Sequence, residues 1–294
     1  MRYTSQNPSA KSLAAPPTRD RLPRKVKLPQ DIVNVIVNFL GDEPANLKAC
    51  SLTSKSFLLQ TRRHLFHRVH INLSHTTRNL RLSQLFNISP YLKECIKDLT
   101  VVVPPTADRS LVSFEEEIPL VSVLSTFKQV MTLTITAFGG QSRDWESDVS
   151  PAWRRALSSI LIADRVQSVS IHDIRNFDTL CLPRCLSLRD LKLSGNSTLT
   201  AHNPPPYFHN SPICLSSLTI GDSADAFLSL VDCCMLPKPA FQLANLQSLE
   251  VEEAIATWAF EDLSFIFSTL SQFTVHLHLY PGMLFIASCT ACVF

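Results

Sequence analysis

Glycine is scarce in this chain: only six of its 294 residues are glycine, at positions 41, 139, 140, 195, 221 and 282. Neither G-x-G-x-x-G nor G-x-x-x-x-G-K-[ST] can be assembled from them, which excludes the common glycine-rich loops that bind phosphate groups. The sequence also lacks G-x-S-x-G and H-E-x-x-H, the motifs of serine hydrolases and zinc-dependent proteases. We therefore expect a protein that is not an enzyme and that uses no cofactor.

Charged residues are few as well, at 18%, and they are unevenly distributed. Residues 1–72 contain 12 Lys or Arg and 4 Asp or Glu, whereas residues 73–294 contain 15 Lys or Arg and 21 Asp or Glu. Hydrophobic residues make up 45% of the chain, enough for a sizeable core in one large or two smaller domains. The hydrophobic content excludes a fully disordered chain, and the uneven charge indicates a domain boundary near residue 72.

No hydrophobic run reaches the roughly 20 residues that a membrane-spanning helix needs. The N-terminus has no apolar run of the kind found in secretory signals. After Asp262 the chain contains no charged residue, and residues 283–294 are apolar but short. We expect no membrane association, and we interpret this last stretch as a final strand packed on the core. The alternative is an array that lacks its C-terminal cap.

The nine cysteines are an odd number in a chain too long for a small disulfide scaffold, so we expect reduced, buried thiols in an intracellular protein. The one C-x-x-C pair is Cys289 and Cys292, and a structural zinc site takes two such pairs. His276 and His278 would share one face of a strand. We expect no metal site from these residues.

Residues 1–27 are predicted to form a disordered basic tail, because they contain seven Lys or Arg against Asp20 alone. The basic cluster 21–27 could serve as a nuclear import signal or contact nucleic acid. A solvated tail fits this composition better, and we expect no nucleic-acid binding.

Residues 28–40 predict a helix with an unusually large apolar surface. Pro29 suits the first helical turn, Asp31 suits the positive end of the helix dipole, and Gly41 can end the helix. After Asp31 the only polar residues are Asn34 and Asn38, which lie on one stripe. Two further short helices are expected up to residue 66, the last of them capped by Thr53 or Ser54. Three helices of this size cannot bury such a first helix alone, so a partner protein or the rest of the chain must cover it.

Residues 28–66 resemble an F-box, especially the form common in basidiomycete fungi. The matching apolar positions of the first helices are Leu28, Pro29, Ile32, Val33, Ile36, Leu40 and Leu47. The stretch Cys50–Phe57 and the basic segment Arg62–Phe66 also match the family pattern. Asp31 stands where the family has Glu, Phe57 where it has Trp, and Thr53 and Ser54 are more polar than the usual residues.

The resemblance implies that the chain is a substrate receptor of an SCF-type cullin-RING ubiquitin ligase in the cytoplasm or nucleus. An F-box docks on the Skp-type adaptor, and through it on a cullin, while the rest of the chain holds a target protein. The residues expected to bind the adaptor are Leu28, Pro29, Ile32, Val33, Ile36, Leu40, Leu52 and Phe57. The alternative is an interaction scaffold whose apolar first helix packs on its own repeats, with no role in ubiquitin transfer.

Residues 67–294 contain a loose repeat. LRDLKLSGN at 188–196 matches the leucine-rich-repeat core L-x-x-L-x-L-x-x-N at every specified position. Weaker L-x-x-L-x-L-like units begin at residues 66, 96, 130, 166, 215 and 246. Each unit predicts a short strand, and segments such as 152–162 predict helices between them. We therefore predict an α/β chain in which a three-helix F-box-like module precedes an irregular leucine-rich-repeat-like solenoid.

Overall fold

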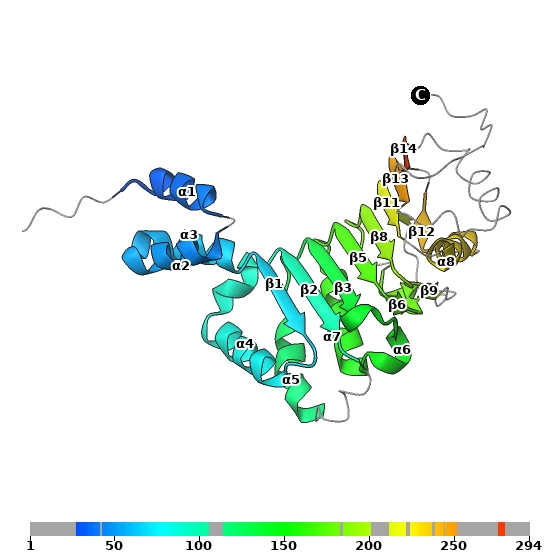
Figure 1. Ribbon diagram of the computed structural model, residues 1–294, viewed down its shortest axis with the longest axis horizontal. Helices are drawn as coiled ribbons and strands as arrows, with labels where there is room; N and C mark the ends of the chain where they lie inside the picture. The colour runs from blue at the N-terminus through cyan, green and yellow to red at the C-terminus, as the bar shows by residue number, and fades with distance from the viewer. Residues whose placement is uncertain are drawn as a thin grey trace, which may run out of the picture.

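The computed structural model describes residues 28–41, 43–105, 114–182, 185–200, 212–221, 224–236, 239–243, 245–251 and 276–279. Within these residues the chain is a mixed α/β protein built around a parallel sheet (Figure 1). The predicted basic tail, residues 1–27, and the apolar stretch 283–294 lie outside the described residues.

Three helices precede the sheet: α1 (Gln30–Phe39), α2 (Pro44–Thr53) and α3 (Lys55–Leu65). α1 follows Pro29, whose φ of −55° is compatible with a helix start, and it places Asp31 in the first turn. α3 is capped by Ser54, whose hydroxyl accepts a hydrogen bond from the amide of Ser56 at 3.3 Å.

The sheet has eight parallel strands, which lie side by side in chain order. They are β1 (Arg68–Asn72), β2 (Asp98–Val103), β3 (Thr132–Ala137), β5 (Ser168–His172), β8 (Asp190–Ser194), β11 (Ser217–Ile220), β13 (Ser248–Val251) and β14 (His276–Leu279). Seven of these are the strands predicted from the leucine-rich units, and each begins two residues after its unit starts. The prediction of a parallel sheet is therefore confirmed.

Helices and short strand pairs connect the main strands. The helices are α4 (Thr76–Ile88), η1 (Pro90–Cys95), α5 (Phe114–Leu124), η3 (Phe138–Gly140), α6 (Trp145–Asp148), α7 (Pro151–Leu161), η4 (Thr179–Cys181) and α8 (Ala224–Met235). The short parallel pairs are β4 (Arg143–Asp144) with β6 (Ile174–Arg175), β7 (Phe177–Asp178) with β9 (Leu199–Thr200), and β10 (Ile213–Cys214) with β12 (Phe241–Gln242). Figure 1 shows α4, α5 and α7 on one side of the sheet. None of the helices described is both long enough and apolar enough to cross a bilayer.

The alternating strand sequences explain the two faces of the sheet. In β3, Leu133 and Ile135 are fully buried, whereas Thr132, Thr134 and Thr136 on the other face are only half-buried. Successive side chains of a strand point to opposite faces, so this sequence gives one apolar and one hydroxyl-bearing face. The aliphatic rows and the helices beneath them form one continuous core.

The helices α1, α2 and α3 have a small apolar cluster of their own. Its members are Val33, Val37 and Leu47, with Leu40, Phe57 and Leu65 packed against them. This cluster is separate from the large core of the sheet. The two parts are joined where α3 meets η1: the guanidinium of Arg62 lies 5.7 Å from the ring centroid of Tyr91 and donates a hydrogen bond to its hydroxyl.

Candidate functional site

Helix α1 carries an exposed apolar stripe on the face opposite the small cluster. Leu28 and Ile32 are each 47% exposed, Val35 is 66% exposed and Phe39 is 89% exposed. Leu28 lies just before the helix, and the four residues are spaced four, three and four apart, the spacing that aligns side chains on one helix face. We call these four residues the α1 stripe. Four large apolar side chains in water along one helix are typical of a protein-binding surface.

Contacts with α3 determine which face of α1 turns outward. Val33 and Val37 are completely buried against the small cluster. Beside them, the Oδ1 atom of Asn38 lies 3.0 Å from Nε2 of His64 and accepts a hydrogen bond from Nε2 of Gln60 at 3.5 Å. These polar contacts at the edge of the apolar contact fix the rotation of α1 about its own axis.

Gly41 allows the chain to leave α1 close to α3. A Cβ atom at this position would lie 3.1 Å from the carbonyl oxygen of Asn38 and 3.2 Å from Nδ1 of His64. A side chain here would therefore have to displace the imidazole that contacts Asn38. The glycine expected to end the helix thus also makes room for the contact that orients it.

The residues predicted to bind an adaptor fall into three groups. Leu28, Pro29, Ile32 and Leu52 are exposed. Ile36, Leu40 and Phe57 are partly buried, the last two at the edge of the small cluster. Val33 has no exposed surface, because it faces α3 within this chain. It therefore supports the helix from inside and offers no surface to a partner.

Two members of the α1 stripe, Val35 and Phe39, were not among the predicted residues. Both lie on the same helix face as Ile32, about one and two turns further along. A period of 3.6 residues groups them with Leu28 and Ile32, but in a helix that is apolar on nearly every side it does not show that this face is exposed. Leu59 in α3 is a further exposed apolar residue that the sequence analysis did not select.

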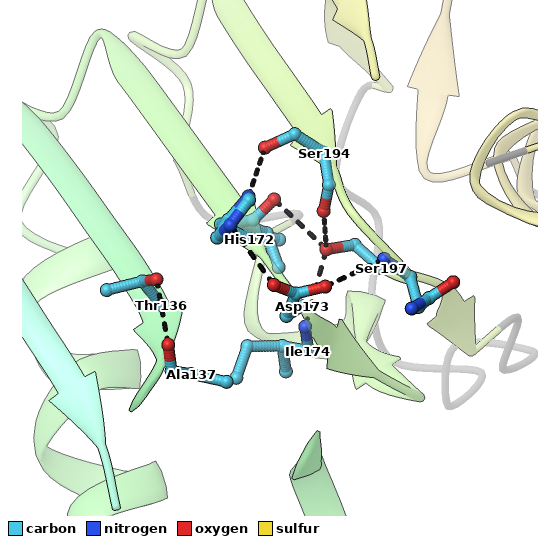
Figure 2. Close-up of polar contacts among 9 residues, drawn as sticks. Thr136, Ala137, His172, Asp173, Ile174, Ser194 and Ser197 are labelled. Carbon is cyan, nitrogen blue, oxygen red and sulfur yellow. Dashed lines mark hydrogen bonds and ion pairs between the residues drawn. The ribbon is translucent and has the colours of Figure 1, made fainter. Parts of the chain in front are cut away.

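A second cluster of chemically capable side chains lies where β5 and β8 end (Figure 2). His172 is paired in register with Ser194 on the neighbouring strand, and its Nδ1 lies 2.8 Å from the Ser194 hydroxyl. Its Nε2 lies 3.1 Å from a carboxylate oxygen of Asp173. The other oxygen of Asp173 accepts a hydrogen bond from the amide of Asn196 at 3.0 Å. An imidazole between a carboxylate and a hydroxyl is the arrangement that activates a serine nucleophile.

The surroundings of this cluster favour a structural role. Ser194 is only 9% exposed, so little of it can meet a substrate. The hydroxyl of Ser197 lies 2.6 Å from the carbonyl oxygen of Ser194 and accepts a hydrogen bond from the amide of Ile174 at 3.3 Å. The cluster thus joins the turn after β5 to the turn after β8. We call its members His172, Asp173, Ser194 and Ser197 the polar brace. The sequence analysis missed it, although His172 and Ser194 occupy the same position of consecutive leucine-rich units.

Buried cysteines are poor candidates for reactive groups. Burial raises the pKa of Cys185 to about 11 and the pKa values of Cys233 and Cys234 to about 12. Burial also raises the pKa of Cys95 and Cys181. These thiols are therefore protonated near neutral pH, and the thiolate is the nucleophilic form. In the part of the chain that the structure describes, no group of three or more His, Cys, Asp or Glu side chains could hold a metal ion.

An open hollow of about 530 Å³ lies at the start of β8 and β11. Its lining includes Leu186, Arg189, Cys214 and Gln247. The guanidinium of Arg189 already donates to the carbonyl oxygens of Leu186 and Cys214, at 3.5 and 3.4 Å. These contacts hold Nη1 of the exposed Arg189 near the backbone, and no second charged side chain lines the hollow, so its lining does not point to one class of ligand.

Comparison with known proteins adds no relative from which a function could be carried over. A scan against protein-family models finds no match, and a search of curated proteins finds none either. The assignment of a function therefore depends on the geometry of the chain itself. Of the sites described above, the α1 stripe is the one whose side chains are large, exposed and outside the apolar clusters of the described residues.

Proposed function

We propose that the α1 stripe docks on a Skp-type adaptor and that the chain is a substrate receptor of an SCF-type cullin-RING ubiquitin ligase. Residues 28–66 would be the F-box-like module, and residues 67–294 an irregular leucine-rich-repeat-like domain that binds a target protein. The observation that carries the proposal is the exposed stripe of Leu28, Ile32, Val35 and Phe39 on a helix whose other face is already packed.

The stripe has the composition of a helix that binds in an apolar groove. Complete burial of a large apolar side chain contributes about 1.5–3 kcal/mol relative to leaving it in water. Phe39 is almost fully exposed, so it has the most to gain from a partner. A few such buried side chains carry most of the affinity of helix-in-groove interfaces, and part of their contribution offsets the entropy lost on association.

The separation of the two apolar clusters supports docking over the scaffold alternative. In that alternative α1 would pack on the sheet and its helices. Among the described residues, α1 instead packs on its neighbours in the small cluster, and its stripe faces away from them. The chain then needs no catalytic group of its own, because a receptor acts by holding a target near the ubiquitin-carrying enzyme and so raising its effective concentration.

The test is co-expression of the full chain with a Skp-type adaptor, followed by size-exclusion chromatography. We expect a one-to-one complex with the original chain. Phe39→Asp and Ile32→Asp should each weaken it by at least about tenfold, since each places a charge in the apolar contact. Ala45→Asp, an exposed apolar position of α2 outside the stripe, is the matched control and should leave binding unchanged. A complex that survives Phe39→Asp and Ile32→Asp in folded protein would contradict the proposal.

A further inference from the structure

Strand β1 has a free edge. It pairs with β2 on one side and is the terminal strand of the sheet, so no described strand lies on its other side. The carbonyl oxygen of His67 accepts from the amides of Lys97 and Asp98, and the amide of Leu73 donates to Val102. In a parallel pair, the N–H and C=O groups of successive residues point alternately to the two sides of the strand. The backbone groups of residues 67, 69, 71 and 73 therefore face β2, and those of residues 68 and 70 face outward.

The part of the chain that contains β1 is rich in basic residues. Residues 62–98 contain seven Lys or Arg and two Asp or Glu, together with four histidines. Arg68 is the one Lys or Arg in β1, and 83% of its side chain is exposed to solvent. The exposed basic and imidazole side chains between the end of α3 and the middle of α4 are Arg63, His67, Arg68, His70, His75, Arg78 and Arg81.

The two acidic residues of this region do not neutralise it. Asp98 contacts Arg68 at 3.2 Å and His67 at 3.5 Å, so one carboxylate already serves two basic groups. A guanidinium has five N–H donors and can hold a second carboxylate beside the first. Glu94 is the other acidic residue, and it lies in η1.

We propose that the free edge of β1 binds an extended acidic peptide, which adds to the sheet as one more strand. The outward backbone groups of Arg68 and His70 would form the ladder of hydrogen bonds, and the basic side chains would select for carboxylates. Nucleic acid would satisfy the charge but has no backbone amides to pair with a strand, so the free edge favours a peptide.

The alternation of side chains along β1 determines which peptide sequence fits the edge best. Arg68 and His70 lie on the hydroxyl-bearing face, and Val69 and Ile71 lie on the buried face. Side chains of an added strand alternate in the same way, so acidic residues at positions i and i+2 would face Arg68 and His70. Aliphatic residues between them would extend the apolar row above the helices. α4 lies at this end of the sheet and leaves Leu80 and Ile88 exposed (Figure 1).

The experiment is a fluorescence-anisotropy titration of the full chain with a labelled six-residue peptide of alternating Glu and Val. We expect saturable binding that the double variant Arg68→Gln/His70→Gln weakens by about fivefold to twentyfold, as the loss of one partly screened charge contact and one imidazole hydrogen bond implies. Arg155→Gln, an exposed cation on α7, is the matched control and should bind like the original chain. Circular dichroism of each variant checks folding.

A second peptide separates strand addition from simple charge attraction. Methylation of all of its backbone amide nitrogens keeps every side chain and removes the donors that would pair with β1, whichever way the added strand runs. We expect this peptide to lose binding. If it binds as well as the first peptide, or if a thymidine oligonucleotide competes equally for the same residues, the edge is a general polyanion site and the proposal is wrong. The assay contains no adaptor, so its outcome does not depend on docking by α1.

Discussion

Substitutions on the two faces of α1 should differ strongly in their effect on the stability of this helix. Val37 is completely buried and Phe39 is 89% exposed, although the two residues are two positions apart. Val37→Ala removes two methyl groups, at about 0.8 kcal/mol each, and leaves unfilled space in the small cluster. We expect it to lower the free energy of opening of α1 by about 2 kcal/mol. Phe39→Ala should change it by less than about 0.5 kcal/mol.

Hydrogen exchange of the α1 amides is the suitable assay, because the small cluster is separate from the main core and α1 can open without global unfolding. A loss of about 2 kcal/mol corresponds to roughly thirtyfold faster exchange. Both substitutions introduce alanine into the same helix, so the gain in helix propensity is similar. If Phe39→Ala accelerates exchange as much as Val37→Ala, the assignment of the inner and outer faces is wrong.

Three further predictions concern the remainder of the chain. The raised pKa values of Cys185 and Cys233 mean that the unfolded state releases these protons first, so stability should fall as the pH rises from about 9 towards 11–12; alkaline titration of the unfolding midpoint measures this. Partial burial by itself would raise the pKa of Asp144, but hydrogen bonds, including those from the α6 amides, lower the pKa overall. The stability that the Asp144 carboxylate gives to the folded state should therefore be present above pH 3.8 and be lost as the pH falls through its folded-state pKa. Asp144→Ala should reduce this loss of stability at acid pH. Arg62→Ala should loosen α3 from η1 by about 1 kcal/mol, because it removes both contacts with Tyr91, and exchange of the α3 amides reports the change.

The strands could be predicted from the sequence because each one is specified by a short pattern of neighbouring residues. Each leucine-rich unit combines an apolar residue before the strand with two alternating apolar residues inside it, as Leu188, Leu191 and Leu193 show. That pattern fixes both the position of the strand and the face that turns inward. β14 was not among the predicted units, and its place beside β13 follows from the tertiary fold.

The orientation of α1 could not be predicted in the same way, because its sequence is apolar on nearly every side. Ile32, Val33, Val35 and Val37 are chemically interchangeable as core residues, and hydrophobic periodicity cannot choose among them. The structure turns Val33 and Val37 inward, towards α3. The contact of Asn38 with α3 is formed with residues more than 20 positions away, so a local pattern does not reveal it.

The polar brace was missed for a related reason, since its members belong to different repeats. It can be tested with two glycines that both have positive φ. Gly139 has φ of 76° and an added Cβ would meet nothing within 4 Å, whereas Gly195 has φ of 60° and an added Cβ would lie 2.1 Å from a carboxylate oxygen of Asp173. Gly139→Ala should therefore cost only the left-handed backbone strain, about 1–2 kcal/mol.

Gly195→Ala should cost about 2–3 kcal/mol more than Gly139→Ala, because it also displaces the Asp173 carboxylate from the Asn196 amide and the His172 imidazole. Asp173→Ala removes the obstructing carboxylate and the same contacts. The double variant Asp173→Ala/Gly195→Ala should then be at least about 1 kcal/mol less destabilised than the sum of the single variants, since the second change finds the space already empty. Urea unfolding of the four chains measures this coupling. Additive values would mean that Asp173 does not occupy the space beside Gly195, and that the turns after β5 and β8 are held together by other contacts.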